Sequence, residues 1–298
     1  MDTLSTWCLA LNCASLLCSV FSLLHYRRTK NSSTSSVTGV LVVSLACCDV
    51  LLACVYMCYP VLGDDMFTVW NGWLCQINGA VDLFAICASV YWVGFINVFS
   101  AMVVLGRKAF TQLNKMTVRR VQLCVWTPAL LIAILCLVFD VIRPSGAWCF
   151  IGSDYGVLRL LVLYVSVLLV FFMSVGLGTL SLKHIRGLST SGVFTRMPVP
   201  MLTQAHMLLC SVAYVIVWLP VALQRVLEFS EKMRYGSDYE YSNATLSALS
   251  RITCNSRGIL DYLAYVGLRW LGRQRGKRAN RNRVKTQSSL ESRPKTLV

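Results

Sequence analysis

The amino-acid sequence predicts an all-α membrane protein: a bundle of seven transmembrane helices, with the N-terminus outside and the C-terminus in the cytosol. Composition supports this fold class, because 56% of the 298 residues are hydrophobic and only 14% are charged, against about 25% charged residues in soluble domains. The apolar residues form seven runs of membrane-spanning length. The basic residues concentrate in alternate breaks between these runs, as the positive-inside rule describes.

Each of the seven runs is long enough to cross a bilayer, for which about 20 residues are needed. They cover residues 4–26, 37–59, 74–105, 121–142, 157–182, 205–227 and 246–268. We therefore expect one transmembrane domain over residues 1–268. Residues 269–298 form a basic tail that begins with a short amphipathic segment around Trp270, and anionic lipid is its expected partner.

The longest run lies within Trp70–Lys108 and contains one acid, Asp82. A helix rises about 1.5 Å per residue, so a helix of roughly thirty residues is longer than a bilayer is thick. We expect this helix to tilt or to protrude. A tilted helix can touch most of its neighbours, so we interpret it as the central helix of the bundle.

The charges of the breaks predict the orientation. The breaks after the first, third and fifth runs contain Arg27, Arg28, Lys30, Arg107, Lys108, Lys115, Arg119, Arg120, Lys183, Arg186 and Arg196. The opposite breaks contain the acids Asp64, Asp65, Asp154, Glu228, Glu231, Asp238 and Glu240. Because Lys and Arg are retained on the cytosolic side, the first set of breaks and the basic tail are predicted to be cytosolic.

Several function classes are disfavoured by the residues. The net charge of +15 alone is compatible with nucleic-acid binding, but no polar stretch pairs basic residues with stacking aromatics, so no nucleic-acid partner is expected. Most of the 14 cysteines lie inside apolar runs and form no cluster with histidine, so we expect no metal site. No Ser/His/Asp grouping or pair of carboxylates indicates an enzyme, and no cofactor is expected.

Motifs spread over several runs resemble those of G-protein-coupled receptors. The matching segments are SLACCD at Ser44–Asp49, Trp126 in the fourth run, VWLP with Trp218 and Pro220, and the spacing of Asp261 and Tyr265 in the seventh run. In that superfamily they correspond to Leu-Ala-x-x-Asp, the fourth-helix Trp, Cys-Trp-x-Pro and Asn-Pro-x-x-Tyr.

Two segments are similar to the cyclic-AMP-receptor-like group, which includes plant and protist relatives. They are NGWLCQINGAVDLFAICASVYW in the third run and GAWCFI at Gly146–Ile151. The resemblance implies a plasma-membrane receptor that binds an extracellular small molecule and activates a heterotrimeric G protein. Two positions depart from the superfamily: Phe99-Ser100-Ala101 stands where rhodopsin-like receptors have an acid-Arg-Tyr triplet, and Tyr262 replaces the proline of the seventh-helix motif.

The resemblance also implies roles for particular residues. Cys75 and Cys149 would form the disulfide that ties the third helix to the following outer loop. Trp218, Pro220 and Tyr265 would form a conformational switch, although a plain proline kink with a packed Trp is the alternative. The G-protein face would include Arg107, Lys108, Arg119, Arg120, Lys183 and Arg186, although the positive-inside effect alone explains their charge.

A buried polar network is predicted around Arg257. Arg257 and Asp261 are four residues apart and share a helix face, and charges at membrane depth face the bundle interior. In rhodopsin-like receptors, the positions of Asp49, Ser89 and Asp261 hold a sodium ion. We interpret Arg257 as replacing that sodium by clamping both carboxylates. The alternative is that Arg257 extends to water.

The predicted ligand site lies nearer the outside. Asp82 is seven residues past Cys75, a depth at which the superfamily contacts ligand, and Trp218 would lie below it. The arginines expected at the same vestibule are Arg159, Arg225 and Arg251. This set favours a small anionic or zwitterionic ligand, since Arg binds carboxylate or phosphate well. The alternatives are that the arginines extend to the interface and that Asp82 pairs with Arg251.

One other function class uses the same intramembrane charges. A transporter or channel would use Asp49, Asp82, Arg257 and Asp261 as a polar path, but the sequence lacks the internal repeats and broken helix pairs of transporters. A retinal protein needs a seventh-helix lysine, and residues 246–268 contain none. The receptor is therefore the favoured prediction.

Overall fold

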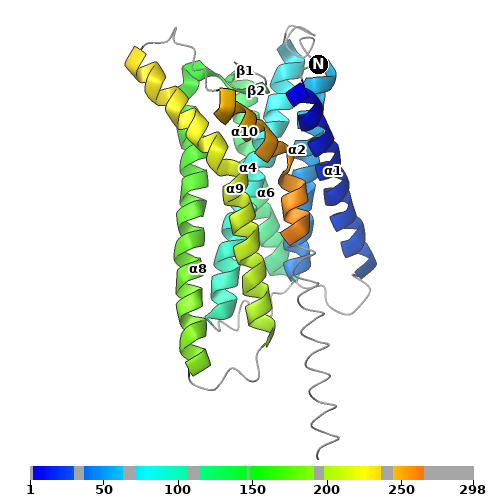
Figure 1. Cartoon of the computed structure of the whole chain (residues 1–298), viewed down its shortest axis with the longest axis vertical. Helices are drawn as coiled ribbons and strands as arrows, with labels where there is room; N and C mark the ends of the chain where they lie inside the picture. Colours follow the sequence, from blue (N-terminus) through cyan, green and yellow to red (C-terminus); the bar gives the residue numbers. More distant parts are fainter. Residues whose placement is uncertain are drawn as a thin grey trace, which may run out of the picture.

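The computed structural model describes residues 3–29, 37–62, 72–105, 115–145, 148–190, 198–235 and 244–264. Among them, six helices are long and apolar enough to cross a membrane. They belong to α1 (Thr3–Thr29), α2 (Val37–Leu62), α4 (Trp73–Val104), α6 (Lys115–Val138), the segment from α7 (Gly156–Arg159) through η3 (Leu160–Val165) to α8 (Ser166–Thr190), and α9 (Pro198–Tyr235). The chain is thus an all-α membrane protein (Figure 1).

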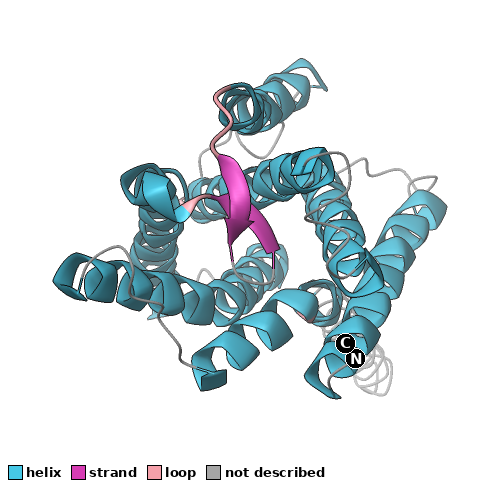
Figure 2. Cartoon of the chain, turned by 90° about the horizontal axis from the view of Figure 1, so that it is seen from above, coloured by secondary structure: helices cyan, strands magenta, loops and turns pink. Residues whose placement is uncertain are grey.

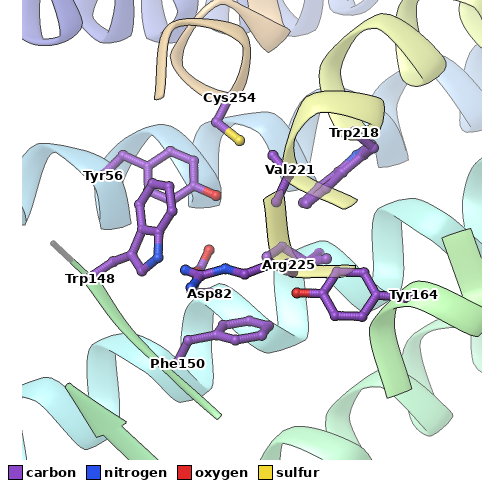
Figure 3. A pocket seen from close by; sticks show the side chains of 10 residues that line it. Tyr56, Asp82, Trp148, Phe150, Tyr164, Trp218, Val221, Arg225 and Cys254 are labelled. Atoms are coloured by element: carbon purple, nitrogen blue, oxygen red, sulfur yellow. The ribbon is translucent and has the colours of Figure 1, made fainter. Parts of the chain in front are cut away.

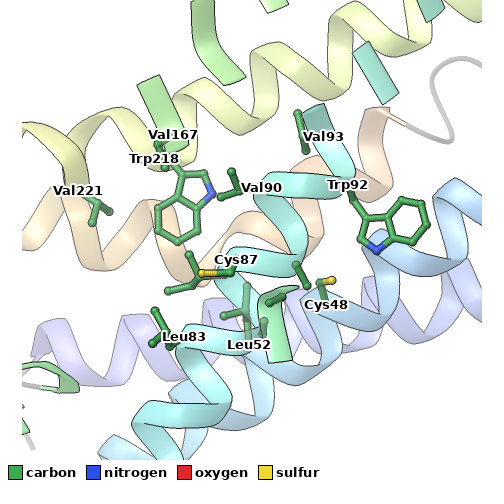
Figure 4. Close-up of a cluster of buried hydrophobic side chains, with 14 of the residues drawn as sticks. Cys48, Leu52, Leu83, Cys87, Val90, Trp92, Val93, Val167, Trp218 and Val221 are labelled. Carbon is green, nitrogen blue, oxygen red and sulfur yellow. The ribbon is translucent and has the colours of Figure 1, made fainter. Parts of the chain in front are cut away.

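The helix α4 lies in the middle of the bundle, as predicted. It contacts α2, α6, α8, α9 and both strands of a hairpin, and 78% of its membrane window is buried, against 22% for α6. Figure 4 shows its side chains Leu83, Cys87 and Val90 in one apolar cluster with Leu52 of α2 and Trp218 of α9. Burial of this apolar surface makes α4 the common packing partner of α2, α6, α8 and α9.

The predicted end of the fourth helix at residue 142 is wrong. The helix α6 ends at Val138, and Asp140 takes a positive φ of 52°. The chain then forms β1 (Ile142–Ser145), which pairs antiparallel with β2 (Trp148–Ile151). The apolar run continues to residue 142 because Val141 and Ile142 are buried against the protein, at 5% and 1% exposure, and not because they face lipid.

The hairpin lies across one end of the helix bundle, and we call this the hairpin end (Figures 1 and 2). It packs closely on α4, because a Cβ added at Gly79 would lie 2.6 Å from Ile142 Cγ2 and 2.9 Å from the Cys149 carbonyl oxygen. The amide of Gln76 and the guanidinium of Arg143 both donate to the Asp140 carboxylate. The turn between α6 and β1 is thereby joined to the start of α4.

The seventh apolar run is interrupted by a turn in the structure. It forms α10 (Ala244–Asn255), a turn at Ser256 and a further helical stretch over residues 257–264. This stretch packs on α1, where the Gly258 N–H donates to Ser15 Oγ at 2.7 Å. Residues 265–298, including Tyr265 and the predicted basic tail, lie outside the described part of the chain.

Candidate functional site

A disulfide holds the hairpin over α4. Cys75, in the first turn of α4, is bonded to Cys149 on β2, which confirms the predicted pairing. The Tyr59 hydroxyl of α2 accepts a hydrogen bond from the Cys149 backbone N–H at 3.1 Å. The cross-link and this bond place the side chains of β2 above the space between the helices.

Below the hairpin is a small cavity, which we call the first cavity (Figure 3). Its volume is about 30 Å³, which is room for about two water molecules. The lining residues are Tyr56, Asp82, Ile86, Trp148, Phe150, Tyr164, Trp218, Val221, Arg225 and Cys254. Figure 3 shows Asp82 and Arg225 between the Tyr56–Trp148 pair and the Tyr164–Trp218 pair. A ligand larger than water must therefore move these side chains apart.

Asp82 is a buried acid whose charge has no ion-pair partner among the described residues. It is 3% exposed, and its Oδ1 atom has no hydrogen-bond partner there. The alternative pairing with Arg251 is therefore absent from the structure. A buried carboxylate oxygen without a donor is costly, so this atom is a candidate contact for a bound group.

The predicted arginines of the site are held by a residue that the sequence reasoning did not place there. Glu228 accepts from Arg225 Nη1 at 2.6 Å and lies 3.6 Å from Arg159 Nη1. The two guanidinium groups also stack near aromatic faces of the hairpin, with Arg225 Cζ 5.7 Å from the Trp148 ring and Arg159 Cζ 5.7 Å from the Phe150 ring. The three-residue spacing of Arg225 and Glu228 indicates an ion pair on one helix, but the predicted helix ended at residue 227, before Glu228.

Arg251 does not line the first cavity. Arg251 and Asn255 share one face of α10, four residues apart, and both line a second cavity. Cys254 lies on the adjacent face and lines the first cavity. The sequence prediction put Arg251 in the same vestibule as Asp82 because it considered depth alone and not the direction of the side chain around the helix.

The structure brings the four residues of the predicted polar network together. Arg257 Nε lies 2.9 Å from Asp49 Oδ1 and 3.9 Å from Asp261 Oδ2. Its Nη1 atom donates to Ser89 Oγ at 3.0 Å, and Ser89 in turn donates to the Ile86 carbonyl at 2.7 Å. Asp49, Ser89 and Arg257 are all buried, so the network lies in the core between α2, α4 and the helical stretch after α10.

Trp218 lies between the first cavity and this network. Its ring lines the cavity, and Arg257 Cζ is 5.8 Å from the ring centroid. Pro220 stands inside α9 two residues further on, where it removes a backbone hydrogen bond and weakens the helix locally. Thr253 Oγ1 donates to the Val217 carbonyl at 3.2 Å, which joins α10 to α9 beside that position.

The predicted G-protein face is only partly described. Arg119 and Arg120 on α6 and Lys183 on α8 are exposed. They lie at the end of the bundle opposite the hairpin (Figure 1). Arg107 and Lys108 lie outside the described residues, as does the side chain of Arg186. In the described ranges, no three His, Cys, Asp or Glu side chains come together in a way that could hold a metal ion.

A helical membrane bundle whose third helix is bonded to a hairpin above a charged, aromatic-lined cavity is typical of receptors resembling G-protein-coupled receptors. The family comparison is more specific. The model of the slime mold cyclic AMP receptor family matches residues 2–239. This is well over half of the chain, and the chain therefore belongs to that family of receptors. No curated protein matches the chain.

Proposed function

We propose that the protein is a seven-helix G-protein-coupled receptor of the plasma membrane. In this proposal the hairpin end and the N-terminus are outside, and the basic tail, residues 269–298, is cytosolic and contacts anionic lipid. A small ligand binds from outside at Asp82 and Arg225, and the receptor activates a heterotrimeric G protein. The family membership and the exposed Arg119, Arg120 and Lys183 at the opposite end support it. Neither supports the transporter alternative.

The ligand that fits the first cavity best is a small zwitterion. Asp82 offers a carboxylate with an unpartnered oxygen, which favours a cationic group. Arg225 shares one carboxylate, Glu228, with Arg159, so positive charge remains for an anionic group. The aromatic side chains that surround both residues suit a planar or cationic portion of the ligand. The unpartnered Oδ1 atom of Asp82 is the single observation that favours a zwitterion over a simple anion.

Cyclic AMP is the alternative that the family name suggests. A cyclic nucleotide offers a phosphate for Arg225 and a planar base for the aromatic walls, but no cation for Asp82. A zwitterion therefore needs the Asp82 carboxylate, whereas a cyclic nucleotide does not. A substitution of Asp82 distinguishes the two ligand classes.

A ligand panel tests the proposal. Cells that express the receptor receive amino-acid-like zwitterions, simple carboxylates and cyclic nucleotides, and G-protein dissociation is measured. We expect a zwitterion to give the response, and we expect Asp82→Asn and Arg225→Gln each to weaken it by about one to two orders of magnitude, because each removes a charge-assisted contact. Arg234→Gln, an exposed arginine on the same helix, is the matched control.

The outcomes are distinguishable at equal surface expression. A response to a cyclic nucleotide that survives Asp82→Asn would support the anionic ligand instead. A response that survives both substitutions would reject the first cavity as the ligand site.

A further inference from the structure

The second cavity is larger than the first and lies next to it at the hairpin end. Its volume is about 150 Å³, and its lining residues are Ser5, Cys8, Tyr56, Tyr59, Trp148, Arg251 and Asn255. A cavity of about this volume accepts one six-membered ring, as an engineered apolar cavity does with benzene. The second cavity therefore has room for a small ring compound without rearrangement.

Among the described residues, the charge that lines the second cavity is positive. Arg251 is the one charged side chain of this lining, and none of the described carboxylates belongs to it. The Cys8 thiol lines the same cavity as the guanidinium. Asn255 Nδ2 donates to the backbone carbonyl oxygen of Arg251 at 2.7 Å, which holds the Asn255 side chain against the helix beside Arg251. Among the described lining residues, an anion finds a guanidinium, whereas a cation finds no carboxylate.

The uncharged part of the wall is aromatic. Tyr56 and Trp148, whose ring centroids are 6.4 Å apart, separate the second cavity from the first. With Tyr59 they contribute three aromatic side chains to the lining of the second cavity. A planar ring packs well against such faces, and a guanidinium binds a carboxylate through two parallel hydrogen bonds.

We propose that the second cavity is a separate binding site for a small planar anion, an aromatic monocarboxylate in its simplest form. Arg251 binds the carboxylate, and Tyr56, Tyr59 and Trp148 pack against the ring. This site goes beyond the proposed ligand site at Asp82. Because Tyr56 and Trp148 line both cavities, an occupant of the second cavity restrains two walls of the first.

Chemical labelling of Cys8 tests the proposal without the receptor's own ligand or a G protein. The full-length protein is placed in phosphatidylcholine nanodiscs and treated with an anionic or a cationic methanethiosulfonate of similar size. The rate at Cys8 is read by peptide mass spectrometry. In the wild type, we expect the anionic reagent to label Cys8 faster than the cationic reagent does. We expect Arg251→Gln to lower the anion-to-cation rate ratio roughly tenfold, because it removes the positive charge that lines this cavity. Arg143→Gln, on the hairpin surface, is the matched control and keeps the ratio.

Protection by benzoate provides the binding readout. Benzoate should slow the labelling of Cys8 in the wild type and not in Arg251→Gln, while uncharged benzamide should protect neither. Equal protection by benzoate and benzamide, or none by either, would overturn the anion site. If phosphatidylglycerol in the nanodisc slows labelling and benzoate does not, the anion is a lipid headgroup and the proposed soluble ligand is wrong. None of these outcomes bears on Asp82, so failure here leaves the proposed ligand site to its own test.

Discussion

At the scale of single residues, Arg257 compensates two carboxylates in the middle of the bundle. Asp49 is only 3% exposed and its Oδ1 atom lies 2.9 Å from Arg257 Nε. A buried charge that loses its partner costs about 3–5 kcal/mol. Asp261 is further away, at 3.9 Å, and more exposed, so Asp49 is the residue that depends most on the guanidinium.

The proposed clamp predicts a change in sodium dependence. Arg257→Gln should lower the thermal unfolding temperature, because it leaves two carboxylates without a cation. Sodium should restore part of the loss, whereas the wild type should unfold at the same temperature in sodium and choline chloride. Thermal unfolding in detergent measures both, with Arg234→Gln as the exposed control. A sodium-dependent wild type, or an Arg257→Gln variant of unchanged stability, would contradict the clamp.

At the scale of elements, the hairpin depends on a close approach to α4. Gly79 faces Ile142 and the Cys149 carbonyl at distances that leave no room for a Cβ atom, and the disulfide of Cys75 lies one turn away. The hairpin cannot move away from α4 freely, because the Cys75–Cys149 disulfide and the close backbone contact at Gly79 hold it at two points. The backbone of α4, as well as its side chains, therefore positions the hairpin above the first cavity.

This contact predicts an asymmetric effect of two glycine substitutions. Gly79→Ala should destabilise the protein by about 1–3 kcal/mol, the usual cost of overpacking, since the nearest neighbours include backbone atoms. Gly176→Ala on α8 is the matched control, because nothing lies within 4 Å of its added Cβ and alanine favours helix. The thermal unfolding temperature should fall for Gly79→Ala and should stay equal or rise for Gly176→Ala. Equal effects would show that the hairpin moves freely over α4.

At the scale of the whole molecule, the sequence predicted most of the helices and the disulfide, but it missed the hairpin strands, the full length of α9 and the direction of Arg251. Apolar runs locate helices because lipid and protein core both select apolar residues. For the same reason, the run through Val141 and Ile142 could not show that the chain leaves the helix and forms a strand. The pairing of Glu228 with two arginines depends on α9 continuing past residue 227, and no apolar run marks that extension. The direction of Arg251 around α10 likewise depends on the packing against α1.

The number of spans predicts where the two chain ends lie. Within the described ranges, six helices are long and apolar enough to cross a membrane, and an even number of spans would place both termini on one side. The proposed seventh span, built from α10 and the helical stretch after it, places them on opposite sides, as the basic breaks also require. We expect an epitope tag at the N-terminus to be stained on intact cells and a tag at the C-terminus only after permeabilisation. If both tags behave alike, the seventh run does not cross the membrane. The Asp49–Arg257–Asp261 network would then lie beside a helical stretch that enters the bundle and returns, and the seven-helix receptor would be the wrong topology for this chain.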